Sequence, residues 1–127
     1  MSNKKFVTAI NCMDGRVQQP VIEWMKKKYA VDYVDMITEP GPNKILAENT
    51  DDTAVRSIRK RVEISVKKHL STTIAIIGHE DCAGNPVDKE KQVQQIKSAV
   101  HIIQSWGYKV SVIGLWVDDQ FNVHEII

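Results

Sequence analysis

Short β-branched runs alternate along this chain with longer segments whose apolar residues recur every three or four positions. The clearest run, residues 73–77, is almost continuously β-branched, as is typical of a strand buried on both faces of a parallel sheet. Residues 6–10 and 33–37 are similar apolar, β-prone runs, and we expect residues 109–117 to form a fourth strand. Alternating strands and helices predict right-handed crossovers and a parallel sheet covered by helices on both faces.

Three segments between these runs carry helical periodicity. The first can open at Pro20, because a proline in the first helical turn loses no hydrogen bond. The second can be capped by Thr50 or Asp51, and the third spans about residues 88–106. Residues 39–43 hold two prolines and a glycine, so we expect an irregular surface segment from there to about residue 50.

The resulting order of elements predicts one α/β domain over residues 1–127. Residues 121–126 alternate in polarity and are expected to form a short fifth strand at an edge, where an antiparallel direction is possible. The expected architecture is a three-layer α-β-α arrangement around a mostly parallel sheet, with strand order of about 2-1-3-4-5.

Composition narrows the class of partners. The net charge of +1 gives no basic excess, so we expect neither nucleic acid nor an anionic membrane as a partner. No apolar run approaches the roughly 20 residues that span a bilayer, and the N-terminus shows no signal-peptide core. We therefore expect a cytoplasmic protein, in which two cysteines are free thiols or metal ligands rather than a disulfide.

The residues that can carry chemistry follow the first and third predicted strands. Cys12 comes after the first strand, and His79 and Cys82 share the loop after the third. In open α/β sheets functional groups gather beyond the carboxyl ends of strands, where the strand order reverses. Thiolate and imidazole are preferred zinc ligands, and three of them leave a fourth position open, as in catalytic zinc sites. Asp14 and Arg16 are placed to act beside such a metal.

Simpler explanations exist for each of these residues. A cysteine can be a small buried hydrophobe, and His79 can be a loop histidine bonded to backbone. Asp14 and Arg16 can form an ion pair that only orders the loop. These explanations account for the residues singly, but not for three metal-ligand types at strand ends with Asp-x-Arg beside them.

The two loops together resemble the motifs of the β-class carbonic anhydrases. Residues 12–16, Cys-Met-Asp-Gly-Arg, are similar to that family's Cys-x-Asp-Ser-Arg, and residues 78–82 are similar to its Gly-His-x-x-Cys. The chain departs from the family at Gly15, where serine is usual, and at Ala83, where glycine is usual. Residues 39–43 stand in place of the family's Arg-Asn-Ala-Gly-Asn loop and lack its arginine.

The resemblance implies that Cys12, His79 and Cys82 bind one zinc ion per chain. It also implies that Asp14 and Arg16 form a catalytic pair, and that zinc hydroxide attacks carbon dioxide, a small-molecule substrate, to give bicarbonate. Two alternatives stay open: the same centre acting on carbonyl sulfide or carbon disulfide, and a non-catalytic metal-binding relative. Because the family forms dimers and higher assemblies, the resemblance further implies a homodimer or higher homo-oligomer.

Overall fold

The computed structural model describes residues 3–127 and contains a five-stranded sheet in the order β2-β1-β3-β4-β5. The first four strands are parallel and β5 runs antiparallel to β4, so the predicted fold class and strand order are confirmed. The strands are β1 (Phe6–Cys12), β2 (Tyr33–Glu39), β3 (Thr73–His79), β4 (Ser111–Val117) and β5 (Val123–Glu125).

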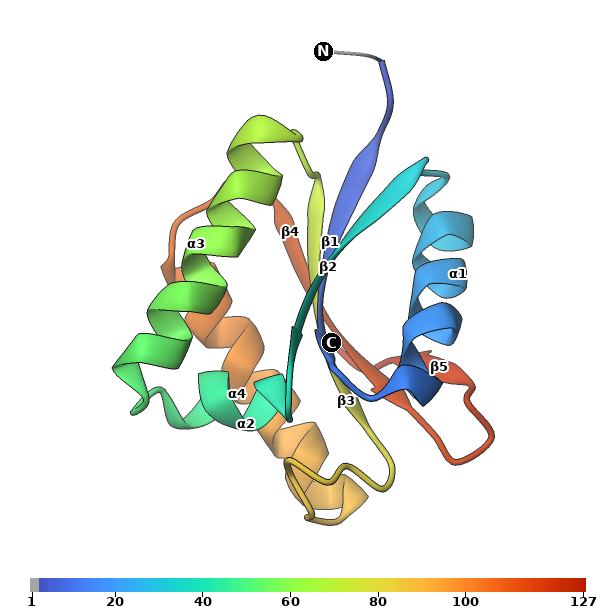
Figure 1. Ribbon diagram of the computed structural model, residues 1–127, viewed down its shortest axis with the longest axis vertical. Coiled ribbons are helices and arrows are strands. Elements are labelled where there is room, and N and C mark those ends of the chain that lie inside the picture. Colours follow the sequence, from blue (N-terminus) through green and yellow to red (C-terminus); the bar gives the residue numbers. More distant parts are fainter. Residues whose placement is uncertain (1–2) are drawn as a thin grey trace.

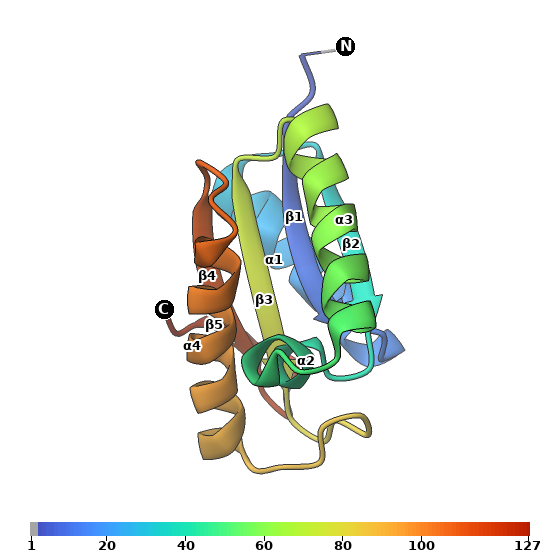
Figure 2. The same ribbon diagram turned by 90° about the vertical axis from the view of Figure 1, so that its left-hand side faces the viewer.

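The helices form unequal layers on the two faces of the sheet (Figure 1). On one face lie α2, α3 and α4, whereas α1 covers the other face near β5. Figure 2 shows the three-helix layer in front of β1 and β3. The helices are α1 (Gln18–Tyr29), α2 (Pro42–Glu48), α3 (Asp52–Lys68) and α4 (Lys89–Ser105), and a 3-10 turn, η1 (Gly15–Val17), precedes α1. None of the helices within residues 3–127 has the length and apolar character needed to cross a bilayer.

Two hydrophobic clusters hold these layers together. Alternate residues of β3 enter them: Ile74 and Ile76 pack under α3 and α4, and Ala75 and Ile77 face α1. All four residues are fully buried, which explains why this strand has almost no polar position. The sequence pattern of the central strand thus follows from helices lying on both of its faces.

The prediction of an irregular segment after β2 was wrong. Residues 42–48 form α2, which buries Pro42, Asn43 and Leu46. Gly41 takes a left-handed conformation (φ 64°) before the helix, and Pro42 occupies its first turn, where a missing N–H costs nothing. The prolines and glycine that suggested an irregular segment are therefore the start of a helix.

The start of α3 was predicted more closely. Of the two candidate caps, Asp51 is the one used, and its side chain accepts a hydrogen bond from the amide of Ala54 at 3.1 Å. Asp88 caps α4 in the same way, through the amide of Lys91 at 2.9 Å. These caps fix where both helices begin relative to the loops at the carboxyl edge of the sheet.

Candidate metal centre

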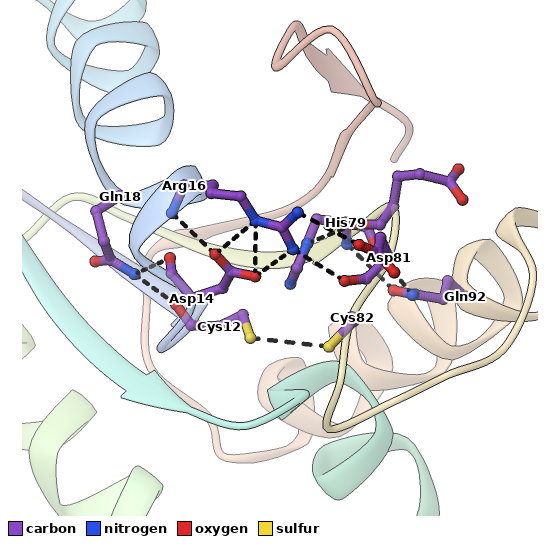
Figure 3. Close-up of polar contacts among 9 residues, drawn as sticks. Cys12, Asp14, Arg16, Gln18, His79, Asp81, Cys82 and Gln92 are labelled. Atoms are coloured by element: carbon purple, nitrogen blue, oxygen red, sulfur yellow. Dashed lines mark hydrogen bonds and ion pairs between the residues drawn. The ribbon is translucent and has the colours of Figure 1, made fainter.

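The three predicted ligand residues come together at the carboxyl edge of the sheet. Cys12 is the last residue of β1, His79 is the last residue of β3, and Cys82 lies three residues further on. Their ligand atoms all lie within 4.8 Å of one another. All three side chains are buried, and His79 is only 2% exposed. Figure 3 shows both sulfur atoms directed to the same point from the two loops.

The imidazole of His79 has one nitrogen bonded and one free. Nδ1 lies 2.8 Å from the carbonyl oxygen of Glu80, and it can only donate there, because a carbonyl only accepts. A neutral ring therefore carries its hydrogen on Nδ1 and a lone pair on Nε2. Nε2 is buried and has no hydrogen-bond partner among the described residues. Metal-binding histidines are oriented in this way, through a bond from the second ring nitrogen.

The two sulfur atoms fit a zinc ion as well. Sγ of Cys12 lies 3.8 Å from Sγ of Cys82, and no disulfide joins them. Two thiolates at about 2.3 Å from one tetrahedral zinc are separated by roughly 3.8 Å. The donor set of two sulfurs and one imidazole nitrogen suits zinc, and it leaves one tetrahedral position for water or a substrate.

The two thiols differ in acidity. Burial raises the pKa of Cys12, but interaction with the His79 side chain and with backbone amides outweighs it and brings that pKa down to about 7. Burial and the neighbouring sulfur raise the pKa of Cys82 to about 11. One thiolate is thus available near neutral pH, whereas the second must lose its proton when a metal binds.

Asp14 and Arg16 form a close pair beside this cluster (Figure 3). The guanidinium donates from Nη2 to Asp14 Oδ2 at 2.7 Å and from Nε to Oδ1 at 3.1 Å. Asp14 also caps η1, because its Oδ1 accepts from the backbone amide of Arg16 at 2.9 Å. These hydrogen bonds lower the pKa of Asp14 to about 2, so its carboxylate stays ionised.

Arg16 also reaches the loop that carries His79 and Cys82, the other two candidate ligands. Its Nη2 donates to the backbone oxygen of Asp81 at 3.1 Å, and its Nη1 lies 3.3 Å from that residue's carboxylate. Asp81 has a left-handed backbone (φ 59°), which is uncommon for a residue other than glycine. Arg16 therefore links the loop after β1 to the loop after β3, a contact that the sequence did not predict.

The loop that holds Cys82 packs closely against residues 40–41, which come just before α2. A Cβ atom on Gly84 would lie 2.7 Å from the carbonyl carbon of Pro40, and one on Gly41 would lie 2.8 Å from Cβ of Asn85. Only glycine allows the two loops to approach so closely. Residues 40–41, which lack the arginine of the related family loop, thus serve here as a support for the ligand loop.

A polar group that sequence reasoning missed is Gln92 of α4, which is 1% exposed and bonds to the backbone of His79. The sequence does contain an indication of it. Gln92 falls four residues before Ile96 and eight before Val100, on the apolar stripe of its helix. A polar residue on a buried stripe needs internal partners, and here they belong to the metal centre.

Comparison with known proteins then places the chain in a family. A family model described as "Putative carbonic anhydrase" matches residues 2–127. The chain belongs to this carbonic anhydrase family. None of the curated proteins compared with this family member matches it.

Solved structures of β-carbonic anhydrases have the same fold as this family member. One of two tetrameric β-carbonic anhydrases from the filamentous ascomycete Sordaria macrospora aligns with a TM-score of 0.60 and 13% identity, covering 98% of this chain and 82% of that one. The β-carbonic anhydrase CafA of Aspergillus fumigatus aligns with a TM-score of 0.53 and 13% identity, covering 97% and 76%. The resemblance inferred from the two motifs is confirmed, and the fold is that of the β class.

Proposed function

We propose that this carbonic anhydrase family member is a zinc enzyme that interconverts carbon dioxide and bicarbonate, with one zinc ion held by Cys12, His79 and Cys82. The observation that carries the proposal is the buried Nε2 of His79, which has no hydrogen-bond partner among the described residues. This nitrogen belongs to the same cluster of possible ligand atoms as the sulfur atoms of Cys12 and Cys82. A buried nitrogen left unpaired costs stability unless a ligand occupies it. Membership of the family and the β-class fold support the same conclusion.

In this proposal Asp14 and Arg16 organise the reacting groups. Arg16 holds the Asp14 carboxylate through two nitrogens, which keeps it from binding the metal as a fourth ligand. Asp14 is then free to accept a hydrogen bond from the reacting water and to orient that water toward carbon dioxide. The chemistry that zinc supplies when bound is Lewis acidity, which makes hydroxide available from water near neutral pH.

In this proposal the substrate enters beside Asp14 and Arg16. The three ligands are buried, whereas the Asp14 and Arg16 side chains are 21% and 49% exposed. A substrate that enters beside them must be small, since the ligands have almost no exposed surface. Carbon dioxide meets this requirement, and so do carbonyl sulfide and carbon disulfide.

We further propose a homo-oligomer, with a dimer as the smallest assembly. The Sordaria macrospora relatives are tetrameric, and Tyr33, Ile64 and Leu70 of this chain expose between 47% and 69% of their surface. A subunit contact over these side chains would remove their apolar surface from water. Light scattering coupled to size-exclusion chromatography distinguishes a monomer from these assemblies. A cytoplasmic location stays a prediction, which fractionation of cells would test.

The zinc content of untagged protein purified without chelators is the first test. We expect about one zinc per chain by plasma mass spectrometry, and hydration of carbon dioxide in a stopped-flow assay. Cys82→Ala is expected to lose both zinc and activity. Zinc binding with turnover of only carbonyl sulfide or carbon disulfide would change the substrate, and zinc without any turnover would indicate a non-catalytic relative. Protein with no affinity for zinc would overturn the proposal.

A further inference from the structure

The last residue of β3 lacks a neighbouring strand on one side. β1 pairs with β3 only as far as Ile76, so His79 lies beyond the end of that ladder. On the other side, the amide of Glu80 donates to the carbonyl of Val117 in β4 at 3.0 Å. Successive residues of a strand direct their backbone groups to opposite sides, so the N–H and C=O of His79 point toward the gap that β1 leaves.

The side chain of Gln92 fills this gap. Its Oε1 accepts from the amide of His79 at 3.2 Å, and its Nε2 donates to the carbonyl of His79 at 2.8 Å. Its amide group therefore pairs with His79 as a residue of a neighbouring strand would. Because of Gln92, the loops after β1 and β3 can separate at the metal centre while the buried N–H and C=O of His79 stay paired.

Two further contacts fix which way the amide of Gln92 faces. Oε1 also accepts from Nδ2 of Asn43 at 3.1 Å, and Nε2 also contacts the carbonyl of Asn85 at 3.4 Å. Both donors lie on one side of the amide and both carbonyls on the other, so a flipped amide would lose all four contacts. Gln92, Asn43 and Asn85 are buried, which keeps water from replacing these partners.

Gly78 makes room for this arrangement. A Cβ atom at Gly78 would lie 2.7 Å from Oε1 of Gln92 and 2.9 Å from Nδ2 of Asn43. Only a residue without a side chain at position 78 lets the amide groups of Gln92 and Asn43 approach the strand this closely.

We infer that Gln92 is a positioning residue of the metal centre. By holding the peptide of His79, it fixes the ring so that Nδ1 donates to the carbonyl of Glu80 and Nε2 is presented to Cys12 and Cys82. The identity of the bound ion as zinc rests on the proposed function, whereas the orientation of His79 does not. Outer residues that orient a ligand commonly change metal affinity by about 10- to 100-fold when they are replaced.

The test compares Gln92→Met with Gln95→Met. Gln95 is a second buried glutamine of α4, and its Oε1 accepts from the side chain of Asn85 at 2.6 Å, but no hydrogen bond described here joins it to a ligand residue. Both variants replace an amide by an apolar side chain of similar length. Zinc affinity is measured by competition with a chromophoric chelator, and ligand geometry by the absorption spectrum of the cobalt(II) form.

We expect Gln92→Met to bind zinc about 10- to 100-fold more weakly than the parent and to change the cobalt(II) spectrum. Gln95→Met is expected to lose clearly less zinc affinity than Gln92→Met, because Gln95 reaches the ligand loops only through the side chain of Asn85. Equal affinity in the parent and Gln92→Met, or the same loss in both variants, would overturn the inference.

A metal-free measurement separates this inference from the proposed function. If the parent binds no zinc, the proposed function fails, and the tautomer of His79 still tests Gln92 through nitrogen-15 NMR of the ring. We expect the Nδ1–H form in the parent and a mixture of both tautomers in Gln92→Met; an unchanged tautomer would refute the role.

If Gln92→Met does not fold, Asn43→Ala removes one contact to Oε1 and leaves Gln92 in place. The same measurements are then made on Asn43→Ala, which is expected to lose zinc affinity by a few-fold. Zinc affinity equal to that of the parent, or an unchanged His79 tautomer where the parent binds no zinc, would again contradict the inference.

Discussion

Two polar clusters lie at opposite ends of the sheet, one buried and one partly buried, and both contain a histidine. At the carboxyl edge, His79 has a buried nitrogen without a partner, beside Cys12 and Cys82. At the amino edge, Nδ1 of His69 lies 2.6 Å from the Asp35 carboxylate. The first cluster has a buried atom without a partner and the second does not, and this difference supports the proposed metal site at the carboxyl edge.

The amino-edge cluster shows what a purely structural network looks like. Ser65 donates to the Asp35 carboxylate at 2.6 Å and lies 2.6 Å from Oγ1 of Thr8, which in turn donates to Ser71 at 2.7 Å. These contacts tie the end of α3 to β1 and β2. The described buried side-chain atoms of this cluster all have partners, so it needs no ligand.

Replacing each histidine by alanine in turn should give the largest difference between the two clusters. His79→Ala removes one of the three proposed ligands, so we expect zinc binding to fall by more than about 100-fold, beyond the usual effect of an outer residue, and the proposed activity to disappear. His69→Ala should keep zinc and activity and lose about 1 kcal/mol of unfolding free energy with one hydrogen bond. Zinc content, stopped-flow rates and urea unfolding measure these outcomes. Loss of zinc in His69→Ala would remove the distinction between the clusters.

Arg16→Ala should have the next largest effect, on activity rather than on zinc content. Without the guanidinium, Asp14 is free to bind the metal and close the open position, so we expect carbon dioxide hydration to fall at least about 10-fold. Arg56→Ala is the control, because Arg56 pairs with Asp52 on the exposed surface of α3, where ion pairs contribute little. Full activity in Arg16→Ala would show that the pair only orders the loop.

A smaller effect is expected from the glycines of the two ligand loops. A methyl group at Gly84 would clash with Pro40, so Gly84→Ala should displace the Cys82 loop and weaken zinc binding by about 10-fold. A Cβ atom at Gly15 would meet nothing within 4 Å, so Gly15→Ala should bind zinc like the parent. Chelator competition tests both. Equal affinities would mean that the Cys82 loop adapts freely to its support.

Much of the fold and the positions of the proposed ligands were predictable from the sequence, because its apolar residues recur periodically. The strand runs and helical stripes predicted an alternating α/β chain, and the strand order common in such folds, 2-1-3-4, placed Cys12 beside His79 and Cys82, as the structure does. The closeness of these side chains was predictable because the carboxyl ends of parallel strands meet at one edge of the sheet.

The unpredicted parts depend on contacts between segments far apart in the chain. The helix that begins at Pro42, the reach of Arg16 to Asp81, and the pairing of Gln92 with His79 each require three-dimensional positions. Local propensity was misleading at Pro42, since proline and glycine both end and begin helices. At Gln92 the polar residue was visible on the stripe, but its partners, 13 and 49 residues away, were not.

Ser65→Ala should show the smallest effect and confine it to stability. Ser65 is 2% exposed, and its loss removes the bond to Asp35 while His69 still holds that carboxylate, so we expect unfolding free energy to fall by about 1 kcal/mol. Ser57→Ala, at an exposed position of the same helix, corrects for the higher helix propensity of alanine. Zinc affinity should match the parent in both variants. A weaker zinc site in Ser65→Ala would show that the sheet couples its two ends, and that the amino-edge cluster also supports the metal centre.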